Sequence, residues 1–417
     1  MSISESEEKW LTDMYWLTPY NWLDEIRKEF ELPKRVYIHD VTLREGDQQP
    51  YIGLKKDEKI RLAQALDDLG VASLEIAPAV SEDDVEVTKK LVRMGLNAKI
   101  ISFVSWQKRD IDLALECDVD GVMVDFVGNP WQSKTFWNMT PDEHIKKGLE
   151  AIQYAKEHGL FVSTLVWDDY RAPLSFLEKN YKAMVYEGKA DHVVVSETFG
   201  FALPWTTVYL VKKVREWVPG VPIEKHGHND FGLATADMLA AVCGGAEVLH
   251  TTMCGIGERA GNAATEEVAV GVELLLGVDT GINLEKLHYT AELVQDLTKF
   301  KVAPNKPIIG ENIFTTVSGW ITWMLQKAEQ AGRIQGMLPF KPELIGAPGR
   351  KIVLGKGSGR SSVMMKLKEM GITGLTNEEL TEITMRVKRE GIIRKGIVPD
   401  AELKRIVEEV TGKKLGS

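Results

Sequence analysis

The sequence predicts an α/β fold, a closed (β/α)8 TIM barrel followed by a C-terminal α-helical subdomain. Short runs rich in β-branched residues recur eight times along residues 36–253. Amphipathic segments with apolar residues three and four positions apart separate successive runs. Beyond about residue 290 the pattern becomes mostly helical. Because eight strand-helix units over roughly 250 residues are the size of a closed barrel, the repeat favours that architecture.

The predicted strands alternate with predicted helices along the chain. Strand followed by helix, repeated, implies right-handed crossovers and a parallel sheet. An open doubly wound sheet is the alternative, and it is weakened because no Gly-x-Gly-x-x-Gly follows the first strand. The strands are predicted at residues 36–39, 73–77, 99–104, 121–126, 160–166, 192–196, 221–225 and 248–253, and helices between them at 55–70, 82–95, 141–159 and 234–245.

The chain is expected to divide into three regions, an N-terminal helical extension over residues 1–34, the catalytic barrel over 35–290 and the helical subdomain over 291–417. Aromatic residues among charges indicate that the extension packs against the barrel or against another subunit; these are Trp10, Tyr15, Trp16, Tyr20 and Trp22. In the subdomain, Thr376-Asn-Glu-Glu and Pro399-Asp are typical helix starts, so two helices are predicted over residues 376–413.

Composition and charge narrow the function classes. The 417 residues are 44% hydrophobic, enough for a large core, and a net charge of −10 without dense Lys/Arg runs disfavours nucleic acid or an anionic membrane as partner. Small molecules are the expected partners. Three widely spaced cysteines indicate a reducing compartment, the cytoplasm. No signal peptide or membrane span is predicted, because the chain starts with an acidic polar run and no window approaches eighteen apolar residues.

His226 and His228 form the first candidate site. Two His one residue apart on a strand point to the same face, so both imidazoles can reach one metal ion. The pair follows an apolar run and enters a polar turn, which is where the catalytic residues of a barrel cluster. Asp40 and Asn262 also follow strand-like runs. Such a mixed nitrogen and oxygen set suits a divalent cation, although a lone His-x-His is more often one packed and one solvated side chain.

Three motifs carry a resemblance to a known family. They are Asp40-x-Thr-Leu-Arg-Glu-Gly, His226-x-His-Asn-Asp-x-Gly and the Gly-x-Gly-Glu-Arg-x-Gly-Asn loop that ends at Asn262. Together they resemble the DRE-TIM metallolyases, in the branch that holds the isopropylmalate, homocitrate and citramalate synthases. The resemblance is strong over residues 35–275 and weaker to about residue 365.

The resemblance implies a divalent metal cation held by Asp40, His226, His228 and Asn262. Mg, Mn, Co and Zn all fit such a site. It also implies two substrates, an acyl-CoA and a 2-oxo acid that chelates the metal through its carbonyl and carboxylate oxygens. A metal in that position acts as a Lewis acid on the ketone. In this family the appended helices reach across to a partner subunit, so a homodimer is expected.

Further residues of these motifs are predicted to act on the substrate. Arg44 is expected beside the metal, where its fixed fork can stabilise developing oxygen charge, or in a salt bridge with Glu75 or Glu45. Glu75, at the end of the second strand, is a candidate to read the substrate side chain or to pair with Arg44. Thr198 stands in a segment similar to the family's Asp-Thr-x-Gly, which implies a hydrogen bond to the substrate carboxylate. Gln48 completes the predicted substrate-binding set.

The chain departs from the family at the expected catalytic base. The family's Phe-x-His-x-Ser-Gly-Ile-His pattern has Thr316 and Ile321 at its two His positions here. A positioned base is worth roughly a hundred- to ten-thousandfold, so another group is expected to supply it. Asp168 and Asp169 follow the fifth strand where the family often has Glu-Asp, with Tyr170 as a candidate acid. Adjacent Asp residues at a strand end are as often only a turn.

Three functions compete at this point. The first is a Claisen-type condensation of an acyl-CoA, acetyl-CoA being expected, with a 2-oxo acid to give a 2-hydroxy di- or tricarboxylate. The second is carbon–carbon cleavage of the hydroxymethylglutaryl-CoA lyase type. Those lyases carry a Cys in the glycine-rich loop, whereas Cys254 lies just ahead of the loop here, which favours the synthase. The third, a binding protein without activity, is disfavoured because the predicted ligands and Arg44 are all present.

Overall fold

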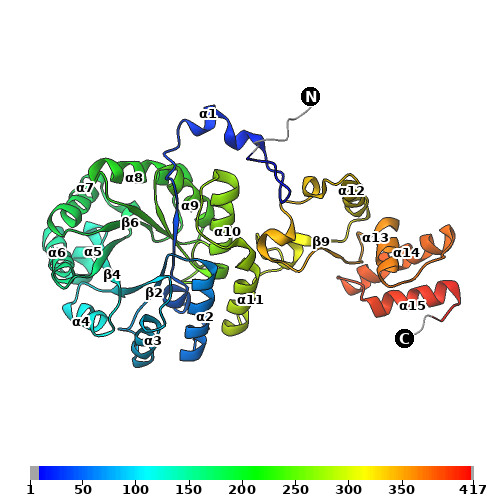
Figure 1. Ribbon diagram of the computed structural model, residues 1–417, viewed down its shortest axis with the longest axis horizontal. Coiled ribbons are helices and arrows are strands. Elements are labelled where there is room, and N and C mark those ends of the chain that lie inside the picture. The colour runs from blue at the N-terminus through cyan, green and yellow to red at the C-terminus, as the bar shows by residue number, and fades with distance from the viewer. Residues whose placement is uncertain (1–8, 415–417) are drawn as a thin grey trace. The chain divides into compact units, whose positions relative to one another are not determined.

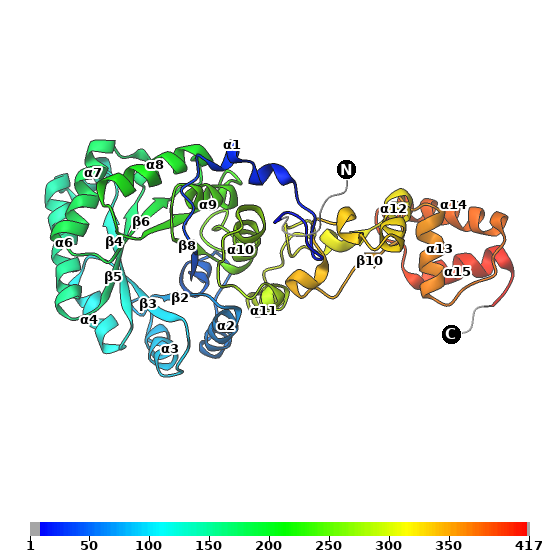
Figure 2. The same ribbon diagram turned by 45° about the horizontal axis from the view of Figure 1, so that its top comes forward.

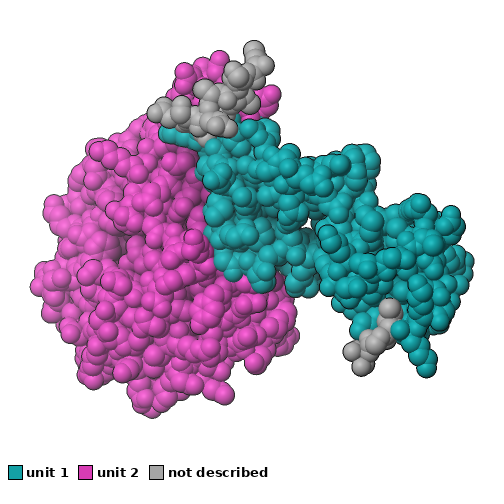
Figure 3. All heavy atoms as spheres, turned by 45° about the vertical axis from the view of Figure 1, so that its right-hand side comes forward, with its two compact units in different colours: residues 1–18, 303–417 teal, residues 19–302 magenta. Residues whose placement is uncertain are grey.

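The computed structural model describes residues 9–414 and divides into two compact units. The barrel unit is Pro19–Val302, and the terminal unit combines Met1–Thr18 with Ala303–Ser417 (Figure 3). The first eight residues, on which the expectation of no signal peptide partly rests, lie outside the described residues. Among residues 9–414, no helix combines the length and apolar content needed to cross a membrane.

Eight parallel strands close into a barrel in sequence order, with β1 paired to both β2 and β8. The closing pair aligns His39 with His250 and Asp40 with Thr251. The predicted TIM barrel is therefore confirmed, and the doubly wound alternative is excluded. The strands are β1 (Tyr37–Asp40), β2 (Ser73–Ile76), β3 (Lys99–Val104), β4 (Gly121–Val127), β5 (Phe161–Trp167), β6 (His192–Glu197), β7 (Ile223–Gly227) and β8 (Val248–Thr251).

Helices ring the outside of the strands (Figures 1 and 2). Their starts follow the sequence, as where Thr140 and Glu143 form a capping box at α6. Gly70 ends α2 with a φ of 100°, and a Cβ there would lie 2.5 Å from the carbonyl oxygen of Gly281. The helices are α2 (Lys56–Leu69), α3 (Glu82–Val92), α4 (Lys108–Glu116), α5 (Pro130–Trp137), α6 (Pro141–Glu157), α7 (Leu174–Lys182), α8 (Pro204–Trp217), α9 (Ala234–Cys243), α10 (Thr265–Gly271) and α11 (Leu287–Thr298).

The barrel interior has an apolar layer made by alternate strand residues. Ile101, Met123, Leu165 and Val194 form this buried cluster, and Phe103 and Trp167 pack against it. Because side chains alternate along a strand, the residues two positions farther on face the same interior, nearer the C-terminal end. That end of the barrel is called the mouth below.

The helical C-terminal region of the terminal unit is confirmed. Its helices are α12 (Gly319–Gln330), α13 (Arg360–Glu369), α14 (Asn377–Arg394) and α15 (Asp400–Thr411), with a two-stranded sheet of β9 (Thr315–Thr316) and β10 (Lys351–Ile352). Thr376 forms the expected capping box with Glu379. At the N-terminal side, residues 9–34 contain only the short turns η1 (Pro19–Trp22) and α1 (Asp24–Arg27), which belong to the barrel unit.

Candidate active site

Three side chains converge at the barrel mouth with the chemistry of metal ligands. One atom each from Glu45, His226 and His228 lies within 4.8 Å of the others, and all three residues are buried. The two His Nε2 atoms are 3.3 Å apart, and Glu45 Oε1 is 3.6 Å from Nε2 of His228. His226 is in β7, His228 follows it, and Glu45 sits in η2 (Thr42–Gly46), the π-helical turn after β1.

Both imidazoles are held in the neutral form that binds metals. Burial, followed by the charges of neighbouring groups, lowers the pKa of His226 well below its usual value. Burial also lowers the pKa of His228, although Glu45 opposes this. Neither Nδ1 atom has a hydrogen-bond partner among the described residues. Neutral imidazole nitrogens with free lone pairs are suitable ligands for a divalent cation.

Asn262 brings an amide into the same place. Its backbone pairs with His228 in an antiparallel bridge, and its side chain is only 2% exposed. Neither amide atom of that side chain has a hydrogen-bond partner among the described residues. Glycines make room for it, since a Cβ on Gly257 would lie 2.0 Å from the Asn262 Oδ1. A buried amide without a partner is uncommon, and an ion at the cluster would satisfy its oxygen.

Asp40, which was expected as a ligand, is not among the three residues of this cluster, and Glu45 takes its place. Its carboxylate accepts hydrogen bonds from the backbone nitrogen of Thr42 at 2.9 Å and from the Thr42 hydroxyl at 3.0 Å. Burial raises the pKa of Asp40 to about 6. Asp40 therefore stabilises the start of η2, and Glu45 in that turn is the carboxylate that lies near His228. The Glu-Gly pair after Arg44 was the only sequence signal for Glu45.

Arg44 lies beside the cluster and also makes the salt bridges considered as its alternative role. Its guanidinium pairs with Glu45 and with Glu75, and it stacks 4.3 Å above the ring of Phe103. Burial by itself would raise the pKa of Glu75, but the charge of Arg44 and a hydrogen bond with His39 lower it to about 2. Glu75 is therefore an ionised partner that fixes the Arg44 guanidinium.

Thr198 and Asp168 lie together at the ends of β6 and β5. The Asp168 backbone nitrogen donates to the Thr198 hydroxyl at 2.9 Å. The Asp168 carboxylate accepts from Asn129 at 2.7 Å, from Gln132 at 2.8 Å and from Arg171 at 2.8 Å. Burial raises the pKa of Asp168, while Arg171 opposes the shift. These bonds anchor the loop between β4 and α5.

Three other expected residues are not brought to the cluster. Asp169 accepts from the Tyr181 hydroxyl at 2.7 Å and from the backbone of Ser196 at 3.0 Å. The Tyr170 hydroxyl bonds to Thr207 at 2.7 Å. Asp169 and Tyr170 thus belong to a buried network on the outer side of the strands. The Gln48 side chain is exposed, and it is the neighbouring Gln49 that bonds to Gly257 in the glycine loop, at 3.0 Å.

Asp125 is an ionisable group that sequence reasoning missed. It lies on β4, two residues beyond Met123, and its Oδ1 is buried without a hydrogen-bond partner among the described residues. Burial raises its pKa to about 7, with Arg44 lowering it and Glu75 raising it. An acid inside the apolar run Val122-Met-Val-Asp-Phe126 was the available signal.

Cys254 is buried, and the two positions that replace the family's His lie in the terminal unit. Cys254 is 4% exposed, in the short turn just before the glycine loop. Thr316 pairs with Ile352 in the two-stranded sheet, and Ile321 lies in the first turn of α12, both within the terminal unit.

Comparisons with known proteins agree with this architecture. The HMGL-like family model matches residues 35–294. An (R)-citramalate synthase of Methanocaldococcus jannaschii is 42% identical over 91% of this chain and 75% of its own length. A homocitrate synthase of the same organism is 40% identical over 91% of this chain and 92% of its own length. A probable 2-isopropylmalate synthase of Ignicoccus hospitalis is 39% identical over 92% and 95%.

Solved structures are similar in the barrel. The HMG-CoA lyase of Bacillus subtilis matches with a TM-score of 0.59 at 21% identity, over 66% of this chain and 97% of that one. The HMG-CoA lyase of Brucella melitensis matches with a TM-score of 0.57 at 22% identity, over 64% of this chain and 100% of that one. At this identity the likeness concerns the fold alone.

Proposed function

The chain belongs to the HMGL-like family, and from that premise we propose that it condenses acetyl-CoA with a 2-oxo acid at the mouth of its barrel. The relatives at 39–42% identity are synthases of the acyltransferase type. In the balanced reaction, the acetyl methyl group loses a proton and bonds to the ketone carbon, and the ketone oxygen takes up a proton. Water then cleaves the thioester, which releases CoA and a 2-hydroxy dicarboxylate or tricarboxylate.

The observation that carries the proposal is the convergence of Glu45, His226 and His228 beside the unpartnered amide of Asn262. This mixed set of oxygen and nitrogen atoms suits a divalent cation. If the residues had only a structural role, the buried Asn262 amide would be expected to have hydrogen-bond partners. When bound, such a cation polarises the carbonyl of the 2-oxo acid as a Lewis acid. Mg, Mn, Co and Zn are all compatible with the donors.

Arg44 and Thr198 are proposed to act on the oxygens of the 2-oxo acid. The Arg44 guanidinium is held by Glu75 and is close to Glu45, so it can stabilise the negative charge that develops on the ketone oxygen. The Thr198 hydroxyl lies at the end of β6 and can donate to the substrate carboxylate. Fixed donors of this kind need no rearrangement as the charge develops.

Asp168 is our proposed base for the acetyl methyl group. It is buried at the mouth next to Thr198, and burial raises its pKa, which makes its carboxylate a stronger base. Replacing Asp168 by Asn is expected to slow exchange of the methyl protons of acetyl-CoA with deuterated solvent by about a hundredfold or more. An exchange rate equal to that of the unmodified protein would remove Asp168 from this role.

We further propose that the protein works as a cytoplasmic homodimer. All three cysteines are buried, and none of them forms a disulfide in the described part of the chain, which suits a reducing compartment.

Thiol release from acetyl-CoA tests the function. The metal-supplemented protein is incubated with a panel of 2-oxo acids, and products are identified by mass spectrometry. Release with at least one acid, accompanied by the matching 2-hydroxy acid, is the expected result. If no 2-oxo acid gives thiol release and the protein cleaves a 3-hydroxyacyl-CoA, the proposed activity would be that of a lyase and not of a synthase.

A further inference from the structure

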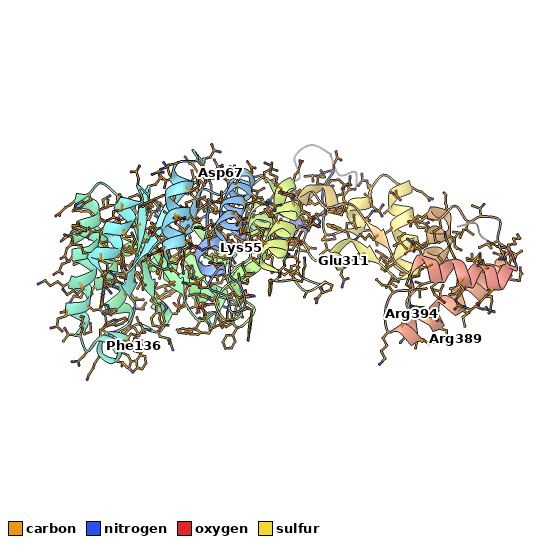
Figure 4. All side chains as sticks on the ribbon, turned by 90° about the horizontal axis from the view of Figure 1, so that it is seen from below. Lys55, Asp67, Phe136, Glu311, Arg389 and Arg394 are labelled. Carbon is orange, nitrogen blue, oxygen red and sulfur yellow. The ribbon has the colours of Figure 1, made fainter. Side chains whose placement is uncertain are left out.

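A cavity of about 300 Å³ opens at the barrel mouth between the ends of β3, β4 and β5 and the helices α5 and α6. Its walls are mainly aromatic, and its polar groups include Asp125 and His144; the aromatic lining is Trp106, Phe126, Phe136, Trp137 and Trp167. In Figure 4, Phe136 lies at the lower edge of the barrel unit and Asp67, near the end of α2, at its upper edge.

The aromatic side chains form one continuous wall. The rings of Trp106 and Trp137 meet edge to face at 5.5 Å, and each lies within 5 Å of the His144 ring. Phe136 extends the wall to Trp167, with ring centroids 6.4 Å apart. Burial lowers the pKa of His144 to about 4, so it presents an uncharged ring at neutral pH. A further aromatic ring could continue this edge-to-face pattern.

Asp125 joins the cavity to the site described above. It faces the same interior as Met123 and lines the cavity. Met123, two residues before Asp125, pairs in register with Phe103 of β3, and the charges of Arg44 and Glu75 act on the pKa of Asp125. Arg44 in turn stacks on Phe103, two residues before Ser105, which also lines the cavity. A 2-oxo acid with its oxygens at Arg44 can therefore extend its side chain past Asp125.

The charge of the lining discriminates between substrates. Asp125 is the one carboxylate among the lining residues, and no Lys or Arg accompanies it. Its Oδ1 has no hydrogen-bond partner among the described residues. An anionic side chain brought into this space would leave its own charge unpaired and partly buried, and the ionised form of Asp125, whose pKa is about 7, would repel it. A second carboxylate on the substrate is thus disfavoured.

We propose that this cavity receives the side chain of the 2-oxo acid and that this side chain is an uncharged ring, as in phenylpyruvate. The inference rests on the proposed condensation and names its substrate class. A cavity of about 150 Å³ already takes up benzene in another protein, so the volume here accommodates one ring with space to spare. A methyl group, as in pyruvate, would leave most of it to water.

The test compares kcat/KM for phenylpyruvate, pyruvate and 2-oxoglutarate with acetyl-CoA as co-substrate. Phenylpyruvate is expected to be preferred over both by at least about tenfold. Replacing Trp137 by Ala should lower kcat/KM for phenylpyruvate by about tenfold or more and leave pyruvate within about twofold. Trp205→Ala is the matched control, because Trp205 is 73% exposed on α8 and does not line the cavity.

The near-isosteric variant Asp125→Asn tests the charge argument. It should raise kcat/KM for 2-oxoglutarate relative to phenylpyruvate, and an unchanged ratio would refute the role of Asp125. Preference for pyruvate or 2-oxoglutarate by the unmodified protein would overturn the inference while the condensation stands.

Failure of the condensation is distinguishable from failure of the inference. If no acid gives thiol release, the proposed function falls, and calorimetric titration with phenylpyruvate decides the inference. Binding that is weakened about tenfold by Trp137→Ala but not by Trp205→Ala would keep it. Absence of binding would overturn it.

Discussion

Arg44 and Glu45 are neighbours in the turn after β1, and they bring opposite charges to the site. Glu45 turns its carboxylate toward His228, whereas the Arg44 guanidinium lies between Glu45 and Glu75. Asp40, earlier on the chain, uses its carboxylate to fix the turn. The ligand and the proposed charge-stabilising group are therefore positioned by one short segment, and single substitutions can separate their roles.

Arg44→Lys should keep the metal content and lower kcat by about a hundred- to a thousandfold. A Lys ammonium keeps the charge, but it cannot reach Glu75 and Glu45 with the same planar fork. Steady-state kinetics together with elemental analysis of the purified variant measure both effects. A loss of only a few-fold would make Arg44 a structural residue.

Glu45→Gln and Asp40→Asn distinguish the two candidate ligands. Glu45→Gln should weaken binding of Mn²⁺ by about tenfold or more, because it removes the ligand charge next to the two imidazoles. Asp40→Asn should change metal affinity much less, since its carboxylate bonds to Thr42. Calorimetric titration of both variants with Mn²⁺ measures these affinities. A larger loss of affinity in Asp40→Asn than in Glu45→Gln would make Asp40 the ligand.

At the level of elements, the segments that follow β1, β5, β6, β7 and β8 contribute Glu45, Asp168, Thr198, His228 and Asn262, and the strands β7 and β2 contribute His226 and Glu75. The strands and helices could be predicted from the sequence because the spacing of apolar residues, every second residue in a strand and about every 3.6 residues in a helix, is a local pattern. His226 and His228 were found for the same reason. Glu45 was missed because a π-helical turn has no sequence period, and Asp125 because nothing local reveals that an acid in an apolar run faces a cavity. Two partners of the Asp168 carboxylate are distant in the sequence, since Asn129 precedes α5 and Gln132 lies in that helix.

The buried network behind β5 should make stability depend on pH through Asp169. Burial raises its pKa from 3.8 to about 8. Ionisation is therefore harder in the folded protein than in the unfolded chain, and its cost grows from about pH 4 to about pH 8. Asp169→Asn, which cannot ionise, should be stabilising relative to the unmodified protein at pH 9 and not at pH 4.

Urea unfolding of both proteins at the two pH values measures this difference. A gain in stability that is equal at pH 4 and pH 9 would show that the ionisation of Asp169 plays no part.

At the level of the whole molecule, the sequence predicted the barrel and the helical C-terminal region, and the family assignment is confirmed. The change of pattern near residue 290 falls within α11, a helix that belongs to the barrel unit, whose last residue is Val302. A local pattern identifies helices but does not tell which core they pack on. Each unit has its own buried core, that of the terminal unit including Leu354, Val363 and Leu403.

The homodimer is a prediction at this scale. In the terminal unit, Trp320 and Trp323 are stacked at 5.0 Å and are 65% and 41% exposed, an apolar surface typical of an interface. Light scattering coupled to gel filtration should give twice the chain mass of 46.6 kDa. Trp320→Asp should shift the population toward single chains. A single-chain mass for the unmodified protein at micromolar concentration would contradict the prediction.

CoA release and product formation by the unmodified protein and by Glu45→Gln, measured side by side with acetyl-CoA and the preferred 2-oxo acid, test the role of the cluster most directly. The unmodified protein is expected to form the 2-hydroxy acid together with CoA, whereas Glu45→Gln is expected to form neither above background. Product formation by Glu45→Gln at the unmodified rate would contradict the assignment of the reaction to this cluster.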